Sequence, residues 1–73
     1  MELKDYVVIL DEGENCWGAY CPDVDGCIAT GTTREECLEN FAEALAFHFD
    51  GMREDGLPIP EPKAVADHVR VAA

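Results

Sequence analysis

Basic side chains are scarce in this sequence. Its 73 residues include five Lys and Arg against sixteen Asp and Glu, which gives a formal net charge of −11 at pH 7. Clustered Lys and Arg neutralise the phosphates of a nucleic acid, so this shortage argues against direct nucleic-acid binding. The negative charge suits a partner with a basic surface, and it equally suits a protein that is simply kept soluble.

Long apolar runs and an export signal are also missing. No stretch approaches the roughly 20 apolar residues that a membrane-spanning helix needs. The first five residues do not form the basic segment followed by an apolar run that marks a signal peptide. We therefore expect a cytoplasmic protein that does not contact a membrane. Residues 1–73 are expected to form one domain, which at this size is only marginally stable by itself.

Motifs for metal, cofactor or nucleophile chemistry are not found. The four cysteines, Cys16, Cys21, Cys27 and Cys37, include no Cys-x-x-Cys pair, and no close pair of histidines accompanies them. A zinc site is therefore poorly supported, and we expect buried free thiols. The glycines form no phosphate-binding loop, and no Ser-His-Asp or Cys-His arrangement has supporting context. The sequence predicts no catalytic residue, no cofactor and no metal ion, and hence no enzyme.

Three strand candidates fill the first part of the chain. Residues 3–10 alternate with apolar side chains on both faces, which is typical of a central strand. A polar turn over residues 11–15 leads to a second strand over 16–21, most simply as a hairpin. Pro22 to Gly26 then form a turn before a third short strand over residues 27–29.

A helix over about residues 33–55 follows. Thr33 is its expected N-cap, and Glu36 completes a capping box. An apolar stripe at helical spacing includes Phe41, Leu45 and Phe49. A Pro-rich connector over 57–62 ends the helix, and a last strand is expected over about 64–72.

These elements predict an α+β fold with the order β-β-β-α-β, in which one helix packs on a small mixed sheet. The last strand is expected to lie beside the first and parallel to it. One helix covers only one face of the sheet, so the other face needs a cover. We therefore expect a homo-oligomer, as a dimer or a larger assembly, or a partner protein.

Five residues are candidates for partner binding. Asp23 and Asp25 lie in the acidic turn, where Asp side chains shape the backbone and can also present carboxylates. Glu36 and Glu43 lie on the acidic side of the helix. Phe47 lies on that side too, almost opposite Leu38 at 100° per residue. A single exposed Phe often has no role, and the alternative is an oligomer or partner contact.

The order and spacing of several short motifs resemble the HicB-like antitoxin domain. The resemblance runs from the first strand through Pro62. It is carried by Tyr20-Cys21-Pro22-Asp23, Gly26-Cys27, Gly31-Thr32-Thr33, Glu35-Glu36, Glu43-Ala44 and Gly56-Leu57-Pro58-Ile59-Pro60. It implies a partial ribonuclease H-like fold. Ribonuclease H-like nucleases place an acidic residue inside the first strand, whereas the centre of this strand is apolar, so Mg²⁺-dependent cleavage is not expected.

The resemblance also implies a function. HicB-like domains are antitoxins of type II toxin–antitoxin systems, and they bind a HicA-like toxin, which is a small basic RNA-cleaving protein. We therefore expect inhibition by surface occlusion. Many family members continue into a DNA-binding segment, and residues 1–73 contain no basic recognition helix, so we expect no DNA-binding domain here. The alternative is a solitary, self-associating structural or adaptor domain that has no toxin partner.

Overall fold

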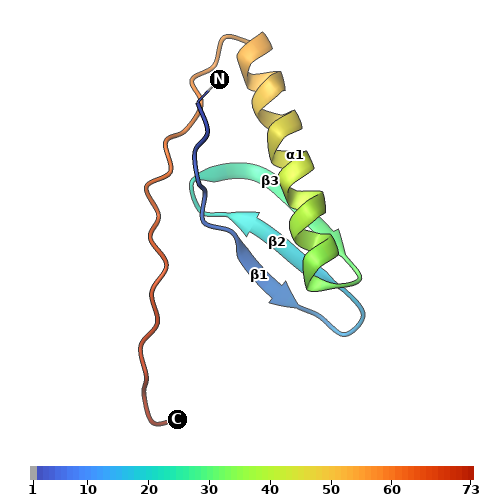
Figure 1. The fold of residues 1–73 in the computed structure, drawn as a ribbon, viewed down its shortest axis with the longest axis vertical. Coiled ribbons are helices and arrows are strands. Elements are labelled where there is room, and N and C mark those ends of the chain that lie inside the picture. Colours follow the sequence, from blue (N-terminus) through green and yellow to red (C-terminus); the bar gives the residue numbers. More distant parts are fainter. Residues whose placement is uncertain (1) are drawn as a thin grey trace.

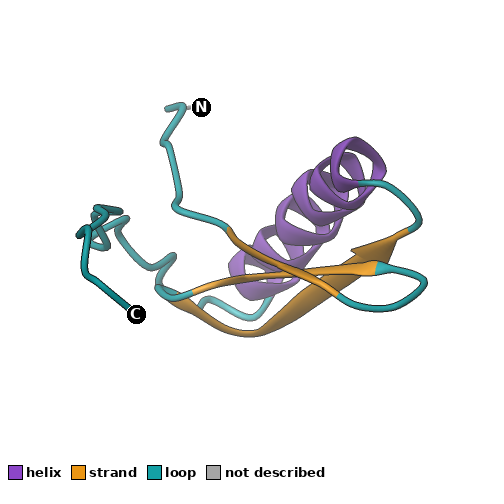
Figure 2. Ribbon diagram, turned by 90° about the horizontal axis from the view of Figure 1, so that it is seen from below, coloured by secondary structure: helices purple, strands orange, loops and turns teal. Residues whose placement is uncertain are grey.

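The computed structural model describes residues 2–73, which contain three strands followed by one helix (Figure 1). The elements are β1 (Ile9–Glu12), β2 (Trp17–Cys21), β3 (Val24–Gly31) and α1 (Arg34–Glu54). The strands form an antiparallel sheet in the order β1-β2-β3. Helix α1 lies against one face of this sheet, and the opposite face is open (Figure 2). The fold is of the α+β class, as predicted.

The strand register decides which side chains face the helix. Ala19 pairs with Ala29, and the neighbouring pair is Tyr20 with Ile28. Because successive side chains of a strand point to opposite faces, the alanine pair lies under α1 while the other pair lies on the open face. Tyr20 is 44% exposed and Ile28 is 74% exposed. On the far side of β2, Ile9 pairs with Tyr20. An apolar row therefore crosses the open face of the sheet.

The capping residues predicted from the sequence set the ends of α1. The Thr33 hydroxyl accepts a hydrogen bond from the Glu36 backbone N–H at 3.1 Å. The Glu36 carboxylate reaches back one residue further than a standard capping box, and it accepts from the backbone N–H of Thr32 at 2.9 Å. At the other end, Gly56 adopts a φ of +71°, and the Leu57 N–H donates to the Met52 carbonyl. These bonds satisfy groups that a helix end leaves unpaired.

The core between α1 and the sheet consists of small side chains and two phenylalanines. Its buried residues are Ala19, Cys21, Val24, Cys27, Cys37, Phe41 and Phe49. Small side chains allow a close approach of helix and sheet. At Gly31 the approach is so close that a Cβ atom would lie 2.6 Å from the Cys37 backbone nitrogen. The first turn of α1 therefore rests directly on the end of β3.

The first strand differs from the prediction in length and place. It was expected over residues 3–10 as a central strand, and the structure instead pairs only Ile9–Glu12 with β2, at an edge of the sheet. The acidic residues Asp11 and Glu12, expected in the turn, belong to β1. The residues before Ile9 find no partner in β2, because the register places Ile9 opposite Tyr20, one residue before the end of β2. The apolar side chains on both faces reflect an uncovered sheet face and not a central position.

The predicted last strand is not formed. Residues 57–73 carry neither helix nor strand, so the sheet is antiparallel and not mixed. The prolines of the connector cannot donate ladder bonds. The backbone N–H groups of Lys63 and Ala64 instead donate to one Asp23 carboxylate oxygen, each at 2.9 Å. Beyond Ala64 the chain extends away from the body (Figure 1). The comparison with a partial ribonuclease H-like fold stays a prediction.

Candidate partner-binding surfaces

The outward side of α1 carries an acidic helix stripe, which we define as Glu36, Asn40, Glu43, Phe47 and Glu54. At 100° per residue these five positions lie within about 40° of one line along the helix. All five are exposed, and Phe47 is 81% exposed. The structure thus brings together three of the predicted residues, Glu36, Glu43 and Phe47, on one surface.

The stripe is not uniformly available to a partner. Glu36 is engaged in capping the helix, and the Asn40 side-chain amide donates to the Thr30 carbonyl on β3 at 2.8 Å. These bonds fix the first half of the stripe to the sheet edge. Glu43 and Phe47 remain as a carboxylate next to an aromatic ring. Because a ring face and a carboxylate both attract cations, this pair suits a Lys or Arg side chain of a partner.

The acidic turn is separate from the stripe. Asp23 lies between β2 and β3 and is half-buried, because its carboxylate holds the backbone of Lys63 and Ala64. Asp25 is exposed near the start of β3. The helix begins beyond the other end of this eight-residue strand, about 25 Å away at the usual rise per residue. The structure therefore gives Asp23 an internal contact, and it does not bring the turn and Glu36 together.

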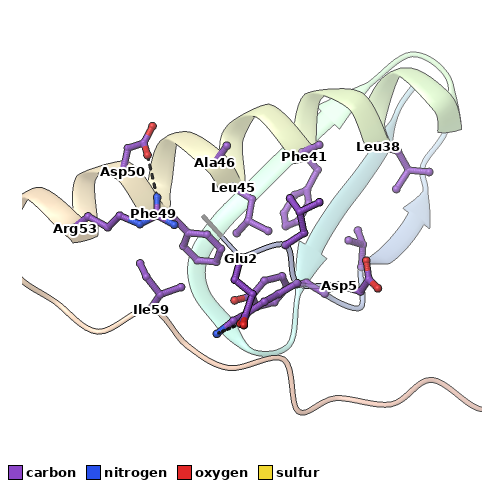
Figure 3. Close-up of a pocket in the computed structure, with 15 residues that line it drawn as sticks. Glu2, Asp5, Leu38, Phe41, Leu45, Ala46, Phe49, Asp50, Arg53 and Ile59 are labelled. Carbon is purple, nitrogen blue, oxygen red and sulfur yellow. Dashed lines mark hydrogen bonds and ion pairs between the residues drawn. The ribbon is translucent and has the colours of Figure 1, made fainter.

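A groove that the sequence did not predict lies on the other flank of α1. The helix packs on β3 and, over a smaller area, on β2, so Tyr6, Val8 and Leu10 pack against the core but are only partly buried. The space between α1 and residues 2–8, here called the inner groove, has a cavity volume of about 930 Å³ (Figure 3). Its apolar lining includes Tyr6, Val8, Leu38, Leu45, Phe49 and Ile59. Its charged lining is mixed: Lys4 and Arg53 are basic, and Glu2, Asp5 and Asp50 are acidic.

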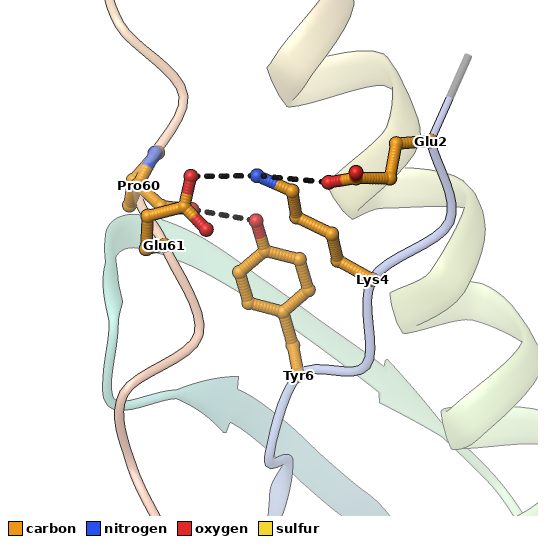
Figure 4. Close-up of polar contacts among 5 residues, drawn as sticks. All are labelled: Glu2, Lys4, Tyr6, Pro60 and Glu61. Atoms are coloured by element: carbon orange, nitrogen blue, oxygen red, sulfur yellow. Dashed lines mark hydrogen bonds and ion pairs between the residues drawn. The ribbon is translucent and has the colours of Figure 1, made fainter.

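One end of the inner groove is closed by polar contacts between the two ends of the chain (Figure 4). The Tyr6 hydroxyl donates to the Pro60 carbonyl at 2.6 Å, and the Lys4 ammonium lies 2.6 Å from the Glu61 carboxylate. The hydrogen bond to Glu61, together with the negative charges of Glu61 and Glu2, raises the pKa of Lys4. The partners are more than 50 residues apart in sequence. No local pattern could therefore have indicated this closure.

All four cysteines are free thiols, of which Cys16 alone is exposed. Burial, with a smaller contribution from neighbouring Cys21, raises the pKa of Cys27. Within residues 2–73 no three His, Cys, Asp or Glu side chains are grouped so that they could hold a metal ion. The helix of this region is not long and apolar enough to cross a membrane.

A comparison with known protein families assigns the chain to one of them. The model of a family described as "HicB_like antitoxin of bacterial toxin-antitoxin system" matches residues 6–72. The chain belongs to the HicB-like antitoxin family. The match extends past Pro62, where the sequence resemblance ended, and it includes residues 64–72.

Individual relatives agree with this assignment. The chain is 30% identical over 64 residues to an uncharacterised 14.9 kDa protein of Haemophilus phage HP1, with 88% of the chain and 48% of the relative covered. It is 37% identical over 57 residues to Antitoxin HicB 2 of Photorhabdus laumondii, with 78% and 41% covered. The chain thus spans about half the length of these two relatives. Among solved structures, a chain of a HicA3 and HicB3 toxin–antitoxin complex is similar, with a TM-score of 0.71, 30% identity, and 82% and 70% covered.

Proposed function

We propose that the protein is the antitoxin of a HicA/HicB-type toxin–antitoxin pair, and that it inhibits a small basic RNA-cleaving toxin by covering the toxin's surface. The similarity to a chain of the HicA3 and HicB3 complex is the observation that carries this proposal. The net charge of −11 supports it, because an acidic surface attracts a protein that binds RNA. In this role the protein is a non-enzymatic regulator that acts in the cytoplasm and does not itself bind nucleic acid.

The acidic helix stripe is the proposed contact surface. Glu43 and Phe47 are exposed side by side on a rigid helix, so little conformational entropy is lost when a partner binds them. The carboxylates take the positions that RNA phosphates would occupy on the toxin. Asp25 adds charge at the far end of β3. Asp23 contributes only through the carboxylate oxygen that the backbone of Lys63 and Ala64 leaves free.

A charge-reversal pair tests the stripe. Glu43→Lys and Glu14→Lys each change the net charge from −11 to −9, but Glu14 lies in the exposed β1–β2 turn and not on α1. We expect Glu43→Lys to weaken binding to HicA3, or to a small basic protein encoded beside the gene, by about tenfold, or 1.4 kcal/mol. Glu14→Lys should weaken it much less. Isothermal titration calorimetry measures both affinities.

Growth of bacteria that co-express the toxin provides the functional readout. The unmodified antitoxin should restore growth, and Glu43→Lys should restore it less well than Glu14→Lys. Persistent toxicity in the presence of folded, soluble protein would refute inhibition. Equal loss from both variants would assign the effect to net charge and would remove the stripe from the proposal.

The second candidate is a self-associating adaptor domain without a toxin. The specific observation in its favour is that the chain has an unfilled apolar groove and an unpaired, apolar terminal segment at the same time. Pull-downs that return the protein itself and no small basic protein would favour this function over inhibition.

A further inference from the structure

Gly51 is a glycine inside α1 that no packing within residues 2–73 requires. Apart from proline, glycine is the least favourable residue in a helix. Gly31 is needed where the helix rests on β3, and Gly56 is needed for its positive φ. Gly51 is exposed, and a Cβ at this position would meet no heavy atom within 4 Å. This glycine therefore leaves a patch of bare backbone on α1 that is open to a partner.

The ring of Phe47 lies one turn before this bare backbone. Side chains of an α-helix lean toward its N-terminus, so a side chain at position 51 would cover the face of the Phe47 ring that points to the C-terminus. With glycine at that position the ring face stays open, and Phe47 is 81% exposed. An open aromatic face carries negative electrostatic potential, which attracts cations.

Glu54 adds a free carboxylate to this arrangement. It lies three residues after Gly51 and leans back toward it. Asp50, which is also near the ring, already accepts from Arg53 at 3.0 Å. Among residues 2–73 Glu54 forms no ion pair, and it is exposed. Phe47, Gly51 and Glu54, here called the ring notch, thus place a ring face, a bare floor and a carboxylate within about 10 Å along the helix.

One class of side chain satisfies all three parts of the ring notch. An acidic side chain is repelled by Glu54 and by the net charge of −11. An apolar side chain would remove the carboxylate from water without giving it a partner. A lysine ammonium is a compact, strongly hydrated charge. An arginine guanidinium is flat, stacks on aromatic faces and pairs with a carboxylate through two hydrogen bonds.

We propose that the ring notch receives an arginine side chain of the basic toxin. The guanidinium lies over Gly51, with one face on the Phe47 ring and with its N–H groups donating to the Glu54 carboxylate. This inference rests on the proposed antitoxin function, and it names the side chain that the contact surface selects. Gly51 lowers the stability of the helix and in return leaves room for the guanidinium.

Filling the notch should therefore raise stability and lower affinity at the same time. Gly51→Ala and Gly51→Gln both favour the helix, so circular dichroism should show a higher midpoint of thermal unfolding. Binding to HicA3, or to a small basic protein encoded beside the gene, should weaken about threefold for Gly51→Ala and about thirtyfold for Gly51→Gln, because the new side chain covers the ring face. Calorimetry measures both affinities. Ala46→Gln, exposed on the same helix about 140° away, should bind like the unmodified protein.

Substitutions of the ring test the nature of the bound group. Phe47→Leu keeps an apolar side chain but removes the ring face, and it should weaken binding about tenfold. Phe47→Trp should retain or strengthen binding, because indole attracts cations best. Nuclear magnetic resonance of a toxin labelled at arginine and lysine identifies the group directly. One arginine Nε–H signal should move upfield on binding, through the ring current of Phe47, and this shift should be absent with Phe47→Leu.

Failure of this inference is distinguishable from failure of the proposed function. If the unmodified protein binds no basic toxin, both are refuted. If it binds and Gly51→Gln binds equally well, the antitoxin role stands and the ring notch is refuted. A shifted lysine signal without a shifted arginine signal, or equal losses of affinity from Gly51→Gln and Ala46→Gln, would also overturn the notch.

Discussion

Gly31 illustrates how one residue sets the distance between helix and sheet. A Cβ at this position would lie 2.6 Å from the nitrogen and 2.8 Å from the Cα of Cys37. Both are backbone atoms, which cannot turn aside as a flexible side chain could. We expect Gly31→Ala to lower the free energy of unfolding by about 1 to 3 kcal/mol, as overpacking does. Urea denaturation followed by circular dichroism measures the change.

Gly18 provides the control for this prediction. It also lies in a strand, but a Cβ there would have no heavy atom within 4 Å. Gly18→Ala should leave stability unchanged or raise it slightly, because it restricts the unfolded chain. Equal losses for the two alanine variants would show that the helix does not rest on Gly31.

A second prediction at the residue scale concerns alkaline pH. Burial raises the pKa of Cys27 above the ordinary 9.0, so the folded state holds this proton more tightly than the unfolded state. The resulting stability is fully present below pH 9 and is lost as the pH rises through the higher folded value. We expect the free energy of unfolding to fall as the pH rises above about 9. Cys16→Ala should retain this fall, and Cys27→Ala should reduce it.

At the scale of elements, Asp23 joins the turn between β2 and β3 to the chain beyond the helix. Its carboxylate accepts from the backbone N–H groups of Lys63 and Ala64. Asp23→Ala should therefore speed amide hydrogen exchange at those two residues by about tenfold, which is the loss of roughly 1.4 kcal/mol of protection. Nuclear magnetic resonance resolves the individual amides. Asp25→Ala, two residues away and exposed, should leave their exchange unchanged.

The elements also show why the sequence predicted some parts and not others. The helix was predicted almost to the residue because Thr33, Glu36 and Gly56 act on neighbours within one or two turns. Strand lengths depend on pairing with distant residues, and β1 begins only at Ile9, which lies opposite Tyr20 near the end of β2. The strand predicted over residues 64–72 is not formed, because an apolar alternation gives a strand only where a sheet edge pairs with it.

The same distinction holds for the candidate site. Glu43 and Phe47 were placed on one surface by helix geometry alone, which needs no tertiary information. The inner groove could not be predicted, because its closure joins Lys4 and Tyr6 to Glu61 and Pro60. Asp23 was predicted as a turn residue that could also face a partner, and its internal bond to the chain beyond the helix depends on the same long-range packing.

At the scale of the whole molecule, the net negative charge predicts opposite salt dependences for self-association and for toxin binding. Salt screens the repulsion between two acidic bodies, and it equally screens their attraction to a basic toxin. Raising the ionic strength from about 0.01 M to about 0.5 M shortens the Debye length from roughly 30 Å to less than 10 Å. We therefore expect the self-association constant to rise and the affinity for HicA3 to fall, both by about tenfold.

Sedimentation velocity measures the first equilibrium and calorimetry measures the second. Glu14→Lys serves as the control, because it reduces net charge without altering the stripe or the groove. Its own salt dependence should be shallower in both experiments. A self-association constant that falls with salt would mean that ion pairs, and not apolar side chains, hold the two copies together.

The reactivity of the buried thiols reports how often helix and sheet separate. Cys21, Cys27 and Cys37 are buried at the junction of helix and sheet, while Cys16 is exposed on the same molecule. An alkylating reagent can modify the first three only when the junction separates, and Cys16 reports the reagent's unhindered rate. The ratio of the two rates gives the fraction of time that the domain is open under native conditions. The free energy of local opening can therefore be measured on the unmodified sequence without denaturant.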